Sequence, residues 1–483
     1  MHHNTASLRR FQRALRVFVA WYAGTLFALA FILLIALFMI DQLESGQVWT
    51  YWWLTVKKLL SEGGTYVIAF FPYLIFVIIR ENVRRYKNTG WTGVAGGLIR
   101  YVALPIALIW TGLEVTRAYR NSEDFTYTWD TSVEHAGSQA RDLYQQDGKH
   151  RGIHVFNLSA DTSDLALLKA NNIEWITLVP YISQELHNEP PLQASSESVS
   201  DSSSVGSSSI DRIAQHAALA AHHNFRLAIK PHVWLSAPQA GAWRSDIEMQ
   251  NEADWDTWFS YYTRRMLAYA ALAEQLNADL FCVGTELHST IVAKPEQWRS
   301  LISQIRSVYS GKLTYAANWS DNLENIPFWD MLDYIGIQAY FPVADVKNPS
   351  LQEIEMGWQP HVDRLSNLAE KYQKPVLFTE IGYRSIATGA LTPWEWSSTT
   401  DFFRRVSHQT QAWSYQAFFN EVWHEPWFAG AHLWEWSANH RKDGRNTGFS
   451  MGGKPALNLV ARGFYPVVSS QPDSTQFNFG LLP

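Results

Sequence analysis

The chain has 483 residues (55.3 kDa), of which 47 % are hydrophobic and only 17 % charged, and its net charge is −6. Its 23 Trp, 21 Tyr and 25 Phe give it far more apolar and aromatic content than a disordered protein carries. The single cysteine, Cys282, excludes a disulfide scaffold, and the lack of a basic excess argues against a nucleic-acid partner.

The first 120 residues differ from the rest in charge and hydropathy. They carry 13 basic against 5 acidic residues, whereas the remainder carries 26 basic against 40 acidic residues. The mean hydropathy of −0.17 therefore averages two unlike parts. Val17 to Ile40 is a run of 24 residues without a charge. Because a helix needs about 20 apolar residues to cross a bilayer, this run predicts a transmembrane helix. A cleaved signal peptide fits less well, since the run is long and no A-x-A-like site follows.

Two further apolar runs lie within residues 1–120. Residues 63–79 carry no charge, and residues 91–113 are interrupted only by Arg100. Basic clusters precede the first run and separate the second from the third, so the positive-inside rule places both clusters in the cytoplasm. With three spans, the chain after Arg120 lies outside the cytoplasm, whereas with two spans it lies in the cytoplasm. We interpret residues 1–120 as a lipid-embedded anchor of about three transmembrane helices. We expect a bacterial inner (cytoplasmic) membrane location, with the remainder periplasmic or extracellular.

Short apolar runs alternate with amphipathic stretches after a predicted juxtamembrane linker at 121–150. The predicted strands are Gly152–Asn157, Trp175–Pro180, Arg226–His232, Leu280–Thr285, Leu313–Asn318, Tyr334–Ala339, Val376–Glu380 and Ala431–Glu435. The predicted helices are Ser163–Asn171, Ile210–His223, Trp255–Leu276, Pro295–Tyr309, His361–Tyr372 and Thr400–Trp423. Such alternation is typical of parallel βα units, and eight units in about 310 residues fit a (β/α)8 TIM barrel of the α/β class. A doubly wound sheet is the alternative, but no G-x-G-x-x-G follows the first strand. We expect the barrel at 151–467 and a C-terminal tail at 468–483.

A Ser-rich segment, residues 194–209, follows the second predicted strand. It has no apolar face to bury, so we expect a flexible loop on the rim that carries the active site in such barrels. The segment is either a tolerated surface insertion or a mobile flap over the site.

Two glutamates, Glu286 and Glu380, stand at the ends of predicted strands, and each is preceded by Thr. Catalytic groups of TIM barrels lie at the carboxyl ends of strands. Two carboxyl groups that face each other there can hydrolyse a glycosidic bond, one as the acid and one as the nucleophile. In retaining enzymes the two groups are about 5–5.5 Å apart. The structural alternative is a pair of rim glutamates bonded to Arg or Lys.

Aromatic and polar residues accompany these strand ends. Pyranose rings stack their C–H faces on Trp and Tyr, while their hydroxyls need polar neighbours. The candidate platforms are Trp234, Trp319, Trp434 and Trp436 at strand ends, with Trp394, Trp396, Trp423 and Trp427 in outer loops and helices. His232 and His288 are candidates for bonding a hydroxyl or a catalytic carboxylate. Because the histidines lack zinc-site spacing and no phosphate loop is present, we expect neither a metal nor another cofactor.

The segments GTEL (284–287) and TEIGY (379–383) resemble the acid/base and nucleophile segments of clan A glycoside hydrolases. More narrowly, residues 152–464 resemble glycoside hydrolase family 113, whose characterised members are β-1,4-mannanases. Residues 436–456 are similar to the segment that follows the eighth strand in such enzymes. The resemblance implies a retaining mechanism with Glu286 as acid/base and Glu380 as nucleophile. It also implies that Tyr340 touches the nucleophile.

One position departs from the clan pattern. Many clan members place Asn directly before the acid/base, where it bonds the 2-hydroxyl of the sugar, but Thr285 stands here. Thr285, Asn318 and His232 are therefore the candidates for that contact. The choice between mannose and glucose stays open at this point.

Two functions remain as hypotheses. The first is a membrane-anchored retaining glycoside hydrolase that cleaves a β-linked polysaccharide, β-mannan or a related β-glycan. The second is a non-catalytic saccharide-binding or exopolysaccharide assembly factor on a degenerate TIM barrel, which Thr285 and the anchor motivate. Both take a poly- or oligosaccharide as partner, with membrane lipid around the anchor and no nucleic acid.

Overall fold

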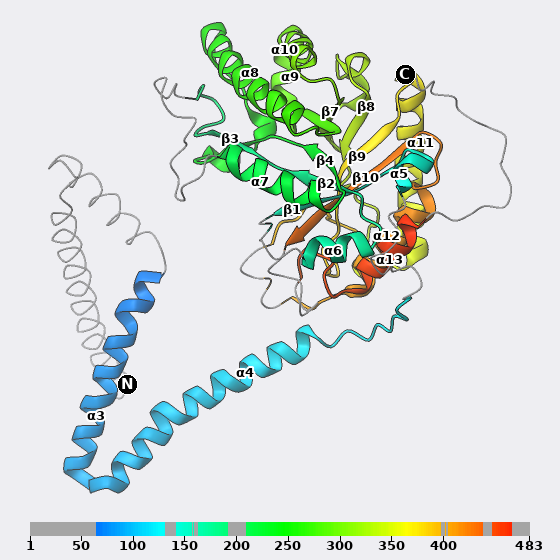
Figure 1. Cartoon of the computed structure of the whole chain (residues 1–483). Helices are drawn as coiled ribbons and strands as arrows, with labels where there is room; N and C mark the ends of the chain where they lie inside the picture. Colours follow the sequence, from blue (N-terminus) through cyan, green and yellow to red (C-terminus); the bar gives the residue numbers. More distant parts are fainter. Residues whose placement is uncertain are drawn as a thin grey trace. The chain divides into compact units, whose positions relative to one another are not determined.

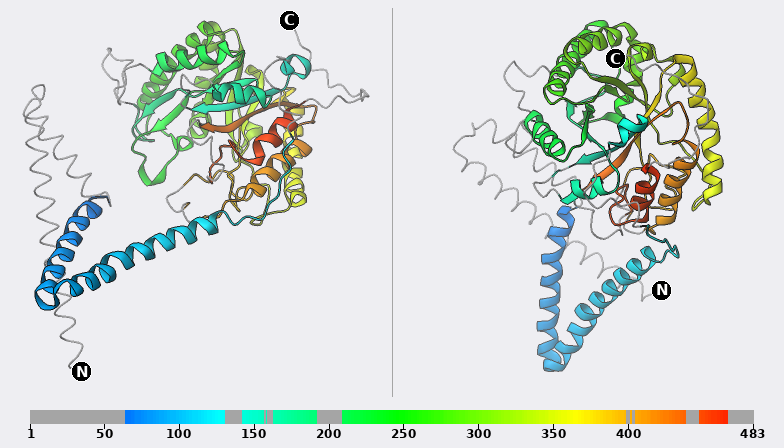
Figure 2. Two further views of the ribbon diagram at one scale, coloured as in Figure 1. Left: turned by 60° about the horizontal axis from the view of Figure 1, so that its bottom comes forward. Right: turned by 45° about the vertical axis from the view of Figure 1, so that its right-hand side comes forward.

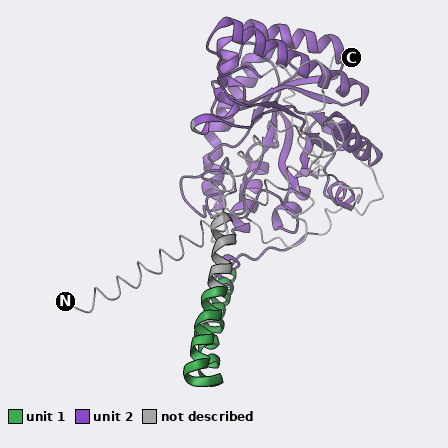
Figure 3. Cartoon of the chain, turned by 90° about the vertical axis from the view of Figure 1, so that its left-hand side faces the viewer, with its two compact units in different colours: residues 1–117 green, residues 118–483 purple. Residues whose placement is uncertain are grey.

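The computed structural model describes residues 64–130, 142–156, 158, 163–191, 209–397, 401, 404–437 and 447–465. The first predicted membrane span, the Ser-rich segment up to residue 208 and the C-terminal tail lie outside these residues. The chain divides into two compact units, residues 1–117 and residues 118–483 (Figure 3).

The described part of the first unit is helical. Helix α3 (Gly64–Leu98) has a kink at Gly90 (φ 64°), and a π-helical turn, η1 (Ile99–Ala103), joins it to α4 (Leu104–Arg120) (Figure 1). No helix among the described residues is both long and apolar enough to cross a bilayer. The second and third predicted spans are therefore unsupported. The second is only the start of α3, which continues through the basic cluster that the sequence predicts as a loop, and the third is divided among three elements.

Eight parallel strands of the second unit close into a barrel in the order β1-β10-β9-β8-β7-β6-β4-β2. They are β1 (His150–Phe156), β2 (Trp175–Leu178), β4 (Arg226–Ile229), β6 (Leu280–Thr285), β7 (Lys312–Asn318), β8 (Tyr334–Gln338), β9 (Val376–Ile381) and β10 (Phe428–Ser437). Helices surround these strands (Figure 2). Each strand corresponds to one of the predicted strands, so the predicted (β/α)8 barrel is confirmed.

The helices around the barrel include all six predicted ones. They are α6 (Ser163–Ala170), α7 (Ser209–His222), α8 (Glu252–Gln275), α10 (Pro295–Val308), α11 (Leu351–Tyr372) and α12 (His408–Glu421), with α5 (Leu143–Asp147), α9 (His288–Ala293) and α13 (Pro455–Phe464) in addition. Helix α11 begins well before the predicted position. A capping box of Ser350 and Glu353 starts it, and Pro360 lies inside the helix instead of preceding it.

A short second sheet stands apart from the barrel sheet. It pairs β3 (Tyr181–Gln184) with β5 (His232–Leu235) in parallel. The single predicted strand Arg226–His232 is thus two strands, because Pro231 has no N–H to continue the ladder. The pair continues the chain beyond the ends of β2 and β4, and it carries side chains of both strands to the rim.

Residues 118–130 belong to the second unit and are bonded to its helices. The Glu123 carboxylate accepts N–H bonds from His408 (2.8 Å) and Gln409 (2.9 Å) in the first turn of α12, where a negative charge is favoured by the helix dipole. The Phe125 ring packs edge-on against Trp413 of the same helix. The segment predicted as a linker therefore begins with residues that are attached to the barrel.

A chain of hydrogen bonds between polar side chains crosses the barrel interior. His150 bonds the Tyr334 hydroxyl (3.3 Å) and His432 (3.1 Å), and the other nitrogen of His432 bonds the Thr177 hydroxyl (2.6 Å). Burial lowers the pKa of His150 well below its ordinary value, and it lowers the pKa of His432 to about 3. Burial acts in the same direction on His154, which lies beside His432. These histidines are therefore neutral in the folded protein.

This neutrality predicts a loss of stability in mild acid. The unfolded chain takes up protons on these histidines as the pH falls through about 6.5 and the folded chain does not, so the free energy of unfolding falls with pH. We expect about 1 kcal/mol of loss per histidine between about pH 7.5 and 5.5. Thermal unfolding of His150→Gln should show a shallower pH slope than the wild type, whereas exposed His222→Gln should keep the slope. If the free energy of unfolding depends equally on pH in the wild type and both variants, His150 is not neutral in the folded protein.

Candidate active site

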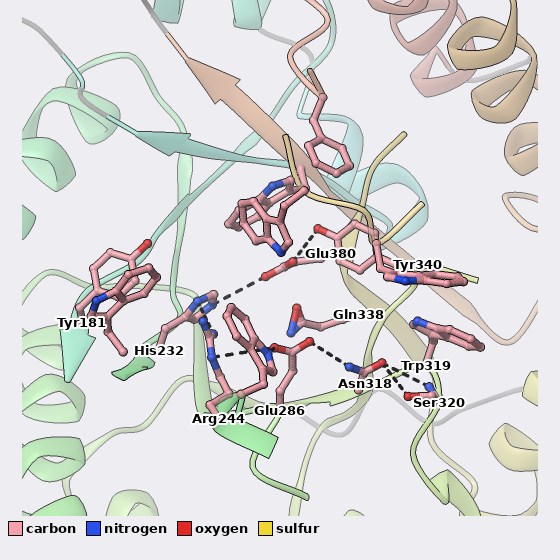
Figure 4. Close-up of a pocket in the computed structure, with 16 residues that line it drawn as sticks. Tyr181, His232, Arg244, Glu286, Asn318, Trp319, Ser320, Gln338, Tyr340 and Glu380 are labelled. Carbon is pink, nitrogen blue, oxygen red and sulfur yellow. Dashed lines mark hydrogen bonds and ion pairs between the residues drawn. The ribbon is translucent and has the colours of Figure 1, made fainter. Parts of the chain in front are cut away.

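A cavity of about 410 Å³ opens at the carboxyl ends of the barrel strands (Figure 4). It brings together most of the predicted site residues: His232, Trp234, Glu286, Asn318, Trp319, Tyr340, Glu380 and Trp434. Glu286 follows β6 and Glu380 lies near the end of β9, and the side chains of both point into this cavity. Both carboxyl groups are buried, with 8 % and 4 % of each residue exposed.

Glu380 is surrounded by a cation and hydrogen-bond donors. Its Oε1 is paired with the ammonium of Lys230, and Nε2 of His232 lies 3.7 Å from the same oxygen. The Tyr340 hydroxyl donates to Oε2 at 2.7 Å. Burial and the Glu380 charge raise the pKa of Tyr340 well above its ordinary value, so the phenol keeps the proton it donates. These contacts fix the position of the Glu380 carboxyl group in the cavity.

Glu286 has a different environment. Its backbone has φ 54°, a left-handed conformation that few residues other than glycine adopt, and such strain clusters at functional sites. Its carboxyl oxygens accept from the Trp243 indole N–H (2.7 Å) and from the Asn318 amide (3.1 Å). Burial raises the pKa of Glu286, the nearby Arg244 guanidinium lowers it in part, and the negative charge of Glu380 raises it further. The net effect is a raised pKa of the Glu286 carboxyl group.

A third carboxyl group lies nearby. Burial and the charge of Glu380 raise the pKa of Glu435, which follows Trp434 in β10, to about 7. Glu435 is not among the residues that line the cavity. It can influence the pH dependence of the site without contacting a ligand there.

Three predicted site residues lie elsewhere. The Thr285 hydroxyl is fully buried and donates to the carbonyl of Pro231 (3.1 Å). His288 is on α9, where it faces Asp321 (3.7 Å). Trp436 is fully buried in the hydrophobic core, because β10 pairs with β1 through a register shift that breaks the alternation relating it to Trp434. In contrast to the prediction, none of these three residues lines the cavity.

Some cavity residues were not predicted as ligands. Trp243 and Arg244 lie in the segment after β5, where no strand pattern marks them, whereas Gln338 occupies the last position of β8, a strand end that the sequence does mark. Arg244 donates to Nδ1 of His232 at 2.8 Å. Because burial lowers the pKa of His232 well below its ordinary value, its ring is neutral and Nε2 carries the hydrogen.

Aromatic rings stand at both ends of the cavity. At one end Trp319 stacks on Trp394, with ring centroids 5.2 Å apart and planes at 29°. At the other end Tyr181 meets the half-exposed Trp234 edge-on at 6.0 Å. Figure 4 shows Tyr181 and Trp319 on opposite sides of the two glutamates. The cavity thus offers stacking surfaces for sugar rings on both sides of the reactive pair.

Two buried carboxyl groups line one cavity, and burial raises the pKa of one of them, Glu286. A pair of carboxyl groups is what general acid catalysis and nucleophilic attack at a glycosidic bond require. A closed barrel with that pair at the ends of β6 and β9 defines a TIM-barrel glycoside hydrolase. The sequence profile of Glycoside Hydrolase Family 113 matches residues 150–454, and the chain belongs to this family. The resemblance read from the two Glu segments is confirmed, and membership favours an enzyme over a non-catalytic saccharide-binding barrel.

Solved structures agree with the family. The GH113 β-mannanase AaManA from Alicyclobacillus acidocaldarius, in complex with ManMIm, is 28 % identical and has a TM-score of 0.55 over 66 % of this chain and 97 % of its own. A GH113 β-1,4-mannanase complex is 24 % identical, with a TM-score of 0.55 over 65 % and 98 % of the two chains, which supports the fold. A search of curated proteins found no match.

The bond from Trp243 predicts a specific change in pH dependence. Its indole N–H stabilises the ionised form of Glu286, so Trp243→Phe should raise the pKa of Glu286 further. The protonated acid then persists to higher pH, and the basic limb of the kcat/KM profile should move up. Trp396→Phe, which alters the cavity wall without this bond, should leave the limb in place. If Trp243→Phe does not move the basic limb, that limb reports the titration of Glu435 instead of Glu286.

Proposed function

We propose that this chain is a membrane-anchored, retaining β-mannanase, with Glu286 as acid/base and Glu380 as nucleophile. The observation that carries this proposal is the contrast between the two buried carboxyl groups. Glu380 is paired with Lys230 and Tyr340, while burial and the charge of Glu380 raise the pKa of Glu286. The choice of β-mannan is supported by the 28 % identity to a β-mannanase of the same family.

The proposed reaction uses Glu380 as the nucleophile and Glu286, whose pKa is raised, as the acid. A carboxylate oxygen of Glu380 attacks the anomeric carbon while the bond to the leaving sugar breaks, and Glu286 gives its proton to the leaving oxygen. The product of this step is a glycosyl ester on Glu380. In the second step Glu286 takes a proton from water as the water oxygen attacks the same carbon and frees Glu380. Two inversions at one carbon retain its configuration.

The position of the aromatic rings supports cleavage within a polymer. Tyr181 and Trp319 lie on opposite sides of the glutamates (Figure 4). The Tyr181 ring contacts Trp234, and the Trp319 ring stacks on Trp394. Because sugar rings stack on such surfaces on both sides of the scissile bond, we infer endo action on a chain of several sugars.

Substitution of the two glutamates tests the assignment of roles. Glu380→Gln should lower kcat/KM on β-1,4-mannan by roughly 10³-fold or more, because the covalent route is lost. Glu286→Gln should lose about 10²–10⁴-fold on mannan. On a dinitrophenyl β-mannoside it should lose much less, because that leaving group needs no proton. Exposed Glu296→Gln on α10 is the matched control and should retain full activity.

Two outcomes would reject this mechanism. One is an equal loss by Glu286→Gln on both substrates, which removes its role as the acid. The other is a first product of inverted anomeric configuration in proton NMR, which removes the covalent step.

We further infer that Val17 to Ile40 holds the chain in a bacterial inner membrane with the barrel outside the cytoplasm. The uncharged run of 24 residues and the four arginines before it support this topology. In the first unit, α4 has no buried residue, and the apolar side chains of Ile106, Leu108 and Trp110 are more than half exposed. Such a surface is suited to contact with lipid.

Fractionation of cells that express the full chain tests the anchor. The protein should stay in the membrane pellet after alkaline carbonate extraction, and Leu33→Lys with Leu34→Arg should release it, because each charge costs about 2.5–3.5 kcal/mol at a helix centre. Alkaline phosphatase fused to the C-terminus should be active. A soluble wild-type chain would reject the anchor, and an inactive fusion would reject the orientation.

A further inference from the structure

Gln338 is a buried polar residue on the cavity surface that the mechanism above does not use. It ends β8, where its Cα is paired with Asn318 of β7 on one side and with Glu380 of β9 on the other. Only 2 % of the residue is exposed, yet it lines the same cavity as both glutamates. Its amide nitrogen, Nε2, has no hydrogen-bond partner among the described residues.

An unpaired amide in such a place is costly, since a buried donor without a partner loses about 1–3 kcal/mol. Among the other donors that line the cavity, Nε2 of His232, Nε of Arg244 and Nε1 of Trp434 also lack a hydrogen-bond partner in the described part of the chain, whereas three donors close to Gln338 are engaged. The Tyr340 hydroxyl bonds Glu380, the Asn318 amide bonds Glu286, and the Thr285 hydroxyl bonds a backbone carbonyl outside the cavity. Gln338 is thus a donor positioned at the cavity without a protein acceptor, which is the state expected of a group that awaits a ligand oxygen.

The place of this donor restricts which ligand oxygen it can meet. The anomeric carbon must lie between Glu286 and Glu380 for the proposed reaction to occur, and β8 stands beside the strand of Glu380. The hydroxyl closest in bonding to that carbon is the 2-hydroxyl, which mannose and glucose carry in opposite orientations. Thr285, at the position where the clan pattern places a ligand of this hydroxyl, is turned away.

We propose that Gln338 donates a hydrogen bond from Nε2 to the 2-hydroxyl of the sugar that Glu380 attacks, and thereby determines which sugar is accepted there. This inference rests on the proposed function of Glu286 and Glu380. Its consequence is that the bond contributes to turnover of a β-mannoside and contributes nothing when the 2-hydroxyl is absent.

Coupling between residue and hydroxyl tests the proposal. The wild type should lose about 10–100-fold in kcat/KM when an aryl β-mannobioside is replaced by its analogue with 2-deoxy at the reacting sugar. Gln338→Met should show a similar loss on the normal substrate and little further loss on the 2-deoxy analogue. If the loss from Gln338→Met and the loss from the 2-deoxy change multiply when the two are combined, the proposal is overturned. Coupling between Gln338 and the 3-hydroxyl, seen with a 3-deoxy analogue, would also overturn it.

Thermal unfolding separates a ligand-binding role from a structural one. Gln338→Met replaces an unpaired buried amide by an apolar group, so its Tm should equal or exceed that of the wild type. Gln184→Met is the matched control, because the Gln184 amide donates to the carbonyls of Leu186 (2.7 Å) and Glu189 (3.2 Å), and its Tm should fall. A fall in the Tm of Gln338→Met as large as that of Gln184→Met would overturn the inference.

The same experiment distinguishes failure of the inference from failure of the proposed function. An active wild type whose Gln338→Met variant shows no coupling rejects only the role of Gln338. A wild type without activity on any β-mannoside rejects the proposed mannanase and this inference with it.

Discussion

The site depends on the ion pair between Lys230 and Glu380 inside the barrel, where the side chains are only 3 % and 5 % exposed. A buried charge is tolerated only with a partner, so one ammonium supports one carboxylate. A second carboxylate at Glu286 is opposed by burial and by the charge of Glu380, which favours its protonated form. The positive charge of Lys230 also helps burial keep the neighbouring rings of His154 and His432 neutral. Burial is the largest cause of the pKa shifts of Glu286, His154 and His432, and the charges of this pair contribute to all three.

A second buried cation shapes the cavity wall. The Arg384 guanidinium pairs with Asp401 and donates to the carbonyls of Trp396 (3.2 Å) and Thr447 (3.2 Å). Arg384 follows the end of β9, so one short segment carries both Glu380 and the guanidinium that bonds the loop of Trp394 and Trp396. Catalytic and stacking surfaces are therefore positioned by the same strand. A change in how the strand is packed must move both together.

The strands and the two glutamates could be predicted from the sequence because each is marked by a pattern of neighbouring residues. A buried parallel strand is a short apolar run, and its catalytic residue directly follows that run, as Glu286 does. Trp243, by contrast, meets Glu286 across 43 residues of chain, and no local pattern encodes such a contact. Trp436 is the converse case, a residue predicted at the site that lies elsewhere. Its position at a strand end predicted a ring that stacks on sugar, but the register shift between β1 and β10 places it in the core. The apolar runs near the N-terminus predicted spans from composition alone, and composition does not show that α3 continues past its apolar part.

Thr285 illustrates how a departure at one position can be structural. Its hydroxyl donates to the carbonyl of Pro231, the residue between Lys230 at the end of β4 and His232 at the start of β5. Thr285 itself directly precedes the left-handed turn at Glu286. One buried hydrogen bond therefore joins the segment that carries Glu286 to the segment that carries Lys230, the ion-pair partner of Glu380. A residue there that reached for the substrate would give up this link, whereas Gln338 of β8 is one of the cavity donors that have no protein partner to lose among the described residues.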